Sequence, residues 1–160
     1  MKIEILERLI ITSLRTGLAT VRTYVGAPEK WIYVDYPRLD ATMPRISVTL
    51  TSSIETPAAV GAEMGGTLGV YEETSFDIDI WVHRTNKTTG LTPARGGTAL
   101  RDYITDEVVD IILALRATLA STYPEIIDIQ KVGESPHPYD EETELFRKTL
   151  TIAVTHLRTY

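Results

Sequence analysis

Three stretches of the chain alternate apolar and polar residues with a period of two, and this pattern restricts the fold more than any other feature. The stretches cover residues 45–52, 75–83 and 145–157. Because successive side chains of a β-strand point to opposite faces, each stretch predicts a strand with one buried face. The other face carries Ser, Thr and Asp, which favours an antiparallel sheet with one face in solvent. A shorter fourth strand is expected over residues 126–132.

Two further segments have the period of an amphipathic helix. Apolar residues recur every three or four positions over residues 2–24, and Gly26-Ala27-Pro28 is expected to end this helix. Thr98 is a suitable N-cap for a second helix that ends near Ser121, ahead of Pro124. Residues 31–34 are left open between a short edge strand and a loop, because Pro37 and Pro44 follow.

These segments predict one α+β domain over residues 1–160. We expect a two-layer sandwich in which two amphipathic helices pack on one face of a mainly antiparallel four-stranded sheet, in the order α-β-β-α-β-β. Residues 53–74 are rich in Gly, Ala and Thr. A structureless loop of that length is uncommon in a compact domain, so a long Gly-rich hairpin arm is the better interpretation.

Composition excludes several classes of site. The chain has no cysteine, which rules out disulfides, thiolate metal sites and cysteine nucleophiles. Its net charge of −6 repels phosphate backbones and makes tight binding of duplex DNA unfavourable. No apolar run reaches the roughly 18 residues that span a bilayer, and no signal peptide is visible, so we expect a soluble protein.

Candidate catalytic and metal-binding residues are few. None of His83, His137 and His156 has a partner at metal-ligand spacing, so each is expected to be a solvated imidazole. Asp77 and Asp79 share one strand face and could act as an acid pair or hold a cation. Exposed acids on a strand also prevent aggregation at the edge of a sheet. We favour this role for Asp77 and Asp79 over catalysis or cation binding. The sequence thus predicts no catalytic residues, no cofactor and no metal.

One charged pattern has two interpretations. Arg8, Arg15 and Arg22 recur at seven-residue spacing along one side of the first predicted helix. They form either a docking stripe for an anionic partner or, as we favour, the solvated back of an amphipathic helix.

The order of these segments resembles the tail terminator and tail-completion proteins of long-tailed viruses. The resemblance rests on the helix at 3–21, the strand at 44–50 that opens with a proline, the Gly-rich insertion, the strand at 76–82, the helix that opens at 97–104 and the closing strand at 146–152. The aromatic segment at 30–44 departs from this layout, which leaves the position within the neck open.

The resemblance implies a structural virion protein at the tail–neck junction, assembled in the host cytoplasm. It implies a homo-oligomeric ring, typically hexameric, that contacts the tail tube protein and neck or adaptor proteins while DNA passes through the lumen without sequence-specific binding. On this basis Asp77 and Asp79 are expected to face the lumen. The expected subunit interface comprises Val60, Met64, Leu68, Val70, Tyr71 and Trp81.

Two alternatives from other classes stay open. One is a small cytoplasmic binding or regulatory α+β domain in which the Gly-rich hairpin is a ligand lid, and this alternative requires an apolar pocket. The other is an enzyme, for which Asp77, Asp79 and His83 are the candidate cluster.

Overall fold

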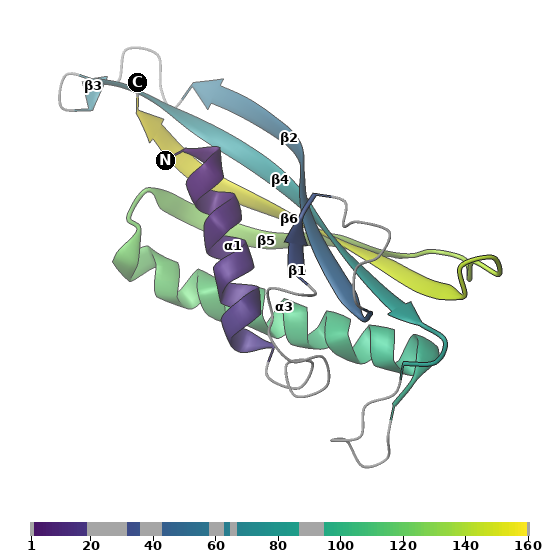
Figure 1. Cartoon of the computed structure of the whole chain (residues 1–160). Helices are drawn as coiled ribbons and strands as arrows, with labels where there is room; N and C mark the ends of the chain where they lie inside the picture. Colours follow the sequence, from purple (N-terminus) through teal and green to yellow (C-terminus); the bar gives the residue numbers. More distant parts are fainter. Residues whose placement is uncertain are drawn as a thin grey trace.

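A computed structural model describes residues 2–18, 32–35, 43–57, 63–64, 67–86 and 95–159 of the chain. The elements in chain order are α1 (Ile3–Gly17), β1 (Ile32–Val34), β2 (Arg45–Pro57), β3 (Glu63–Met64), β4 (Thr67–His83), α3 (Gly97–Thr122), β5 (Ile126–Pro136) and β6 (Leu145–Thr159). Figure 1 shows the helices and the strands as two layers. No helix among the described residues is both long and apolar enough to span a membrane.

The strands form one mixed sheet in the order β1-β2-β4-β6-β5, and the two-residue β3 pairs with β4 outside this path. β1 runs parallel to β2, with Ile32 opposite Ile46. The other pairs are antiparallel. The predicted four-stranded, mainly antiparallel sheet in the order α-β-β-α-β-β is therefore wrong. Alternation shows which face a side chain occupies, but it does not show the direction of a neighbouring strand, and three residues are too few to show a period.

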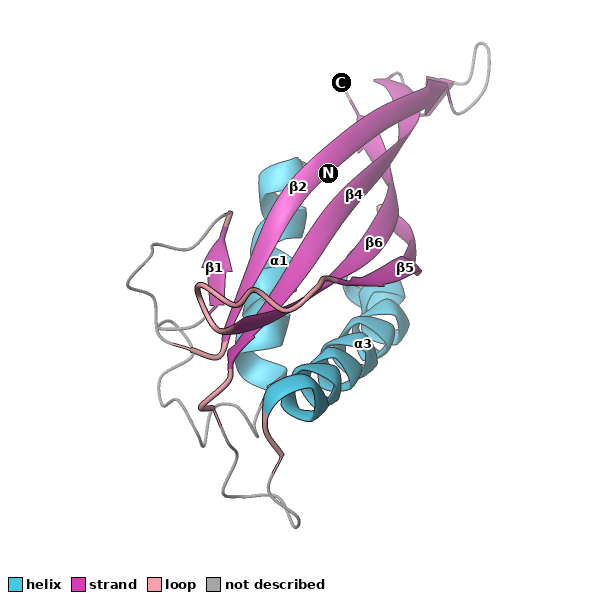
Figure 2. Cartoon of the chain, turned by 90° about the vertical axis from the view of Figure 1, so that its right-hand side faces the viewer, coloured by secondary structure: helices cyan, strands magenta, loops and turns pink. Residues whose placement is uncertain are grey.

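Both helices cover the same face of the sheet (Figure 2). α1 lies against β1 and β2, whereas α3 lies along β4, β5 and β6, and the two helices contact each other. The largest fully buried side chains between the layers are Phe76, Leu6, Ile10, Leu14, Leu18, Ile32, Ile46, Ile78, Ile80, Leu100 and Ile104. The alternating strand residues and the helical stripes predicted from the sequence meet in this core.

The first helix is shorter than predicted. α1 ends at Gly17, and Leu18 leaves the helical conformation while its backbone N–H donates to the carbonyl oxygen of Leu14. Gly17 lies so close to α3 that a Cβ at this position would come within 2.7 Å of Ile111. Glycine therefore permits the close approach of the two helices. Val21 and the predicted stop signal at 26–28 lie outside the described residues.

The second helix begins one residue earlier than its predicted cap. Thr98 is inside α3, and the N-cap is Gly96, which makes no side-chain cap. Gly97 has a positive φ of 55°, and a Cβ there would lie 3.3 Å from the ring of Phe146. The positive φ therefore requires the conformational freedom of glycine, and a Cβ would also make a tight contact with the Phe146 ring.

The long strands contain bulges that change which side chains are buried. In β2, Leu50 is the last residue before a register shift and is 40% exposed, although alternation placed it on the buried face with Ile46 and Val48. Two shifts in the edge strand β5 likewise expose Ile127 and Val132. Bulges of this kind on an edge strand disfavour uncontrolled pairing with other chains.

The predicted hairpin arm corresponds to the distal parts of β2 and β4. These strands pair from Arg45 opposite Trp81 to Pro57 opposite Val70, and β6 continues beside β4 to Thr159. Residues 58–62 and 65–66 of the predicted arm lie outside the described residues.

Candidate assembly interface

The outer face of the sheet, which no described helix covers, begins with a row of three stacked side chains. Arg45, Trp81 and Arg147 are directly opposite one another on β2, β4 and β6. Each guanidinium carbon lies 5.2 Å from the Trp81 ring centroid, within the range of a cation–π interaction. Trp81 is only 7% exposed, so this predicted interface residue is buried within the subunit. Burial also lowers the pKa of Arg45.

Asp79 occupies the next row of the same face and is also buried. Its carboxylate accepts two hydrogen bonds from Arg147, at 3.1 Å from Nε and 2.9 Å from an Nη, and a third from the Thr149 hydroxyl. Asp77 shares this face as predicted, but it is partly exposed and accepts from the Thr151 hydroxyl at 2.6 Å. A carboxylate that is buried and paired with an arginine is poorly suited to proton transfer.

The described residues contain no group of three or more histidines and acids that could hold a metal ion. His83 lies beside Thr85 and 3.5 Å from Glu144, and the His137 Nε2 atom lies 2.7 Å from the Thr149 hydroxyl. The candidate enzyme cluster of Asp77, Asp79 and His83 is therefore not assembled into a metal site.

His156 is fully buried, so the prediction of a solvated imidazole is wrong for this residue. Its Nε2 atom lies 3.2 Å from the Thr74 hydroxyl and 3.6 Å from the carboxylate of Glu72, which is 1% exposed. Arg158 also reaches Glu72, at 3.3 Å. Nδ1 has no hydrogen-bond partner among the described residues. Burial lowers the pKa of His156, although the nearby Glu72 carboxylate acts in the opposite direction.

Sequence patterns missed this polar cluster because Glu72 and Thr74 belong to the Gly-rich insertion rather than to an alternating run. The two polar interruptions of the inner face of β6 were visible, however, at Lys148 and His156. Lys148 is explained by an ion pair with Glu134 at 2.7 Å. Both interruptions thus mark a side chain with a charged partner, which is fully buried at Glu72 but not at Glu134.

The predicted subunit interface is only partly described. Tyr71 lies on the outer face of β4 and is 40% exposed, and Val70 is half-buried. The side chains of Val60, Met64 and Leu68 lie outside the described part of the chain. Ile54, on the neighbouring strand β2, is 60% exposed and adds apolar surface near Tyr71.

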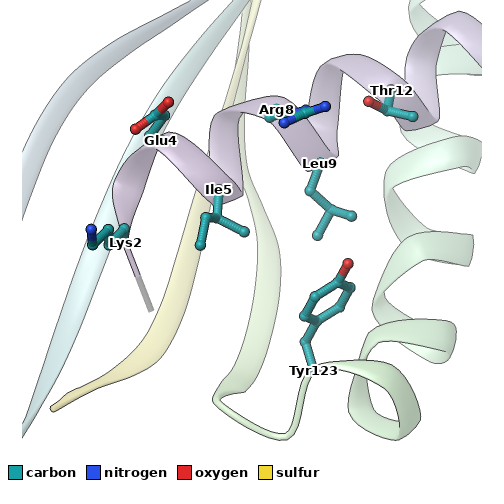
Figure 3. Close-up of a pocket in the computed structure, with 7 residues that line it drawn as sticks. All are labelled: Lys2, Glu4, Ile5, Arg8, Leu9, Thr12 and Tyr123. Carbon is teal, nitrogen blue, oxygen red and sulfur yellow. The ribbon is translucent and has the colours of Figure 1, made fainter.

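A groove of about 590 Å³ lies between the N-terminal half of α1 and the end of α3; we call it the helix groove. It is lined by Lys2, Glu4, Ile5, Arg8, Leu9, Thr12 and Tyr123. Ile5 and Leu9 point from α1 toward Tyr123 (Figure 3). A shallower hollow of about 390 Å³ continues from Thr12 along the contact between α1 and α3.

The arginine stripe predicted on α1 does not act as one unit. Arg15 donates to the backbone carbonyl oxygen of Ile32 at 2.9 Å and so holds the parallel edge strand. Arg22 lies outside the described residues. Arg8 is exposed at the helix groove, which agrees with the favoured interpretation of a solvated helix face.

The turn between β5 and β6, residues 139–145, is acidic and internally bonded; we call it the acidic tip. Asp140 and Leu145 exchange two backbone hydrogen bonds of 3.1 and 3.3 Å. The Asp140 carboxylate accepts from the backbone N–H of Glu142 and from the Thr143 hydroxyl, and these bonds hold its pKa below the usual range. Glu144 pairs with Arg84 at 2.8 Å. The tip is therefore well ordered while most of its side chains face solvent.

Comparison with known proteins gives a similarity of fold. No family model matches the chain, and no curated protein matches it in sequence. Among solved structures, the chain is similar to one from the virion of a native gene transfer agent particle, with a TM-score of 0.58 and 13% sequence identity. The match covers 93% of this chain and 92% of that one. The two chains thus share one architecture along nearly their whole length.

Replacing Asp79 by Ala is expected to lower the free energy of unfolding by about 2 kcal/mol, because it leaves the Arg147 guanidinium and the Thr149 hydroxyl without their acceptor. The partly exposed Asp77→Ala is the matched control, with an expected loss below about 1 kcal/mol. Urea denaturation measures both values. Equal losses in the two variants would contradict the structural role of the Asp79–Arg147 pair.

Stability is expected to fall as the pH drops below about 6.5, the ordinary value for histidine. Because the folded pKa of His156 is lowered, the unfolded chain takes up a proton there that the folded chain does not. The stabilisation is complete above the unfolded pKa and is lost as the pH falls toward the folded one. Unfolding free energies at pH 7.5 and 5.5 test this, and His156→Gln should reduce the difference between them. An unchanged difference in the variant would assign the pH dependence to other groups.

Proposed function

We propose that this chain is a structural protein of a virion or virus-like particle, without catalytic activity. The observation that supports this most is the shared fold over 93% of the chain with a protein from a gene transfer agent virion. The acids that could have formed an active site are instead engaged in hydrogen bonds on the outer face of the sheet.

At finer detail, we propose that the chain forms a ring, hexameric by the resemblance described above, that caps the tail tube and joins it to the neck. DNA passes through the lumen of this ring. Of the two acids expected to face the lumen, Asp77 is partly exposed and can repel a passing phosphate backbone. Asp79 is buried against Arg147 and contributes to the stability of the outer face.

The end of the sheet formed by β2 and β4 is proposed to contact neighbouring subunits. Ile54 and Tyr71 expose apolar surface there, at 60% and 40%, as expected where a strand pair meets another chain. Val60, Met64, Leu68 and Val70 belong to the same proposed contact by their position in the sequence.

Disrupting the gene for this chain in the particle that encodes it is expected to yield heads and tails that do not join. A ring at the junction leaves the two substructures complete but unconnected when it is missing. Electron microscopy of the lysate measures the fraction of joined particles, and complementation with the wild-type chain is the control. Normal particles that lack the chain would refute the proposal.

Removing residues 58–66 is expected to leave the subunit folded but to prevent assembly, because the buried core of the described residues is formed by other segments of the chain. Circular dichroism reports folding, and native mass spectrometry reports assembly of the variant and of the wild type. A deletion variant that assembles like the wild type would show that the hairpin arm is not part of the subunit interface.

A further inference from the structure

We propose that the acidic tip of one copy binds in the helix groove of a second copy, so that subunits associate head to tail. This inference rests on the proposed function, since it names the contact through which subunits of an assembly would join. Three features of the described residues support it: the chemistry of the groove, the chemistry of the tip and their positions in the molecule.

The helix groove suits an acidic and partly apolar ligand. Its floor is apolar, formed by Leu9 and by Ile5, which is 44% exposed. Its rim carries two cations, Lys2 and Arg8, against the single carboxylate of Glu4. Neither cation forms an ion pair within the described part of the chain. A net positive rim is notable in a chain whose net charge is −6, because most of its surface repels acids.

The acidic tip has the complementary properties. Glu141 and Glu142 are exposed, and neither takes part in an ion pair among the described residues. Tyr139 is 38% exposed beside them and packs on Phe146 with ring centroids 4.7 Å apart. An aromatic side chain flanked by acids can fill an apolar floor while the carboxylates meet the cationic rim. Because hydrogen bonds to Asp140 already order the turn, little conformational entropy is lost on binding.

The tip and the groove lie at opposite ends of the molecule (Figure 1). Tyr123 of the groove is followed by β5, whose 11 residues run to Pro136 at the base of the tip. At about 3.3 Å per residue, this strand separates them by about 36 Å. The tip therefore cannot reach the groove of its own chain and needs another copy. A contact between two different surfaces is heterologous, and its repetition closes into a ring when the rotation allows.

The absence of cysteine permits a crosslinking test without background. Two separately tagged single variants, Ile5→Cys in the groove and Glu142→Cys in the tip, are mixed and treated with a short bismaleimide. We expect a covalent heterodimer of the two tags. The matched control replaces Ile5→Cys by Leu113→Cys, which has a similar exposure of 46% but does not line the groove.

Each outcome decides between arrangements. A heterodimer well above the Leu113→Cys control supports the head-to-tail contact. Homodimers of the Ile5→Cys variant alone would show that two grooves face each other, which overturns the proposal. Equal or absent crosslinking in both mixtures overturns it as well.

A charge exchange tests the chemistry of the same contact. Arg8→Glu in the groove is expected to weaken association about tenfold, and so is the tip variant that combines Glu141→Arg with Glu142→Arg. A chain that carries the groove change and the tip changes together is expected to recover much of the wild-type affinity. Analytical ultracentrifugation gives the association constants, and thermal melting verifies folding of these surface variants. If the combined variant associates no better than the single ones, the tip and the groove do not meet.

This contact and the proposed function can fail separately. Assembly into a ring without the Ile5–Glu142 crosslink would leave the function in place and refute this contact. The crosslink in a chain that no particle incorporates would support the contact and refute the function.

Discussion

The pairing of β4 with a neighbour on each side is the constraint on which the rest of the molecule depends. β4 pairs with β2 from Trp81 to Val70, and with β6 from His83 to Gly69. A slip of one residue would turn every side chain of the strand to the opposite face. The slip would carry Phe76, Ile78 and Ile80 out of the core and Asp79 into it. The cost of that exchange fixes the register, and the register then sets the composition of both faces.

The two faces use this register in different ways. On the inner face the register aligns apolar side chains under α1 and α3. Toward one end of this face it places the buried Glu72 carboxylate opposite the buried His156 imidazole. On the outer face it places Trp81 between two arginines. Long-range pairing thus builds two polar arrangements from residues that are far apart in the sequence, and both make stability depend on charge as well as on apolar burial.

Some features of the molecule could be predicted from the sequence with physical reasons. The core positions of three strands follow from alternation, and the two helices follow from apolar positions every three or four residues. The Pro- and acid-rich run Ser-Pro-His-Pro-Tyr-Asp-Glu-Glu that precedes β6 can be read from the sequence, and Arg8 belongs to the cationic pattern predicted on the first helix. The role of either segment depends on what lies opposite it in an assembly, which no local pattern contains.

The sequence by itself determined the local periods, the absence of thiol chemistry and the negative charge, because each follows from residue types and their spacing. Tertiary structure alone decided the parallel edge strand β1, the end of α1 at Gly17, the exposure of Leu50 and the burial of His156. Each of these depends on a partner distant along the chain, such as Ile46 opposite Ile32 or Ile111 beside Gly17. The spacing of residues along one segment does not carry information about such partners, so the pairing of strands and the packing of helices had to be seen in three dimensions.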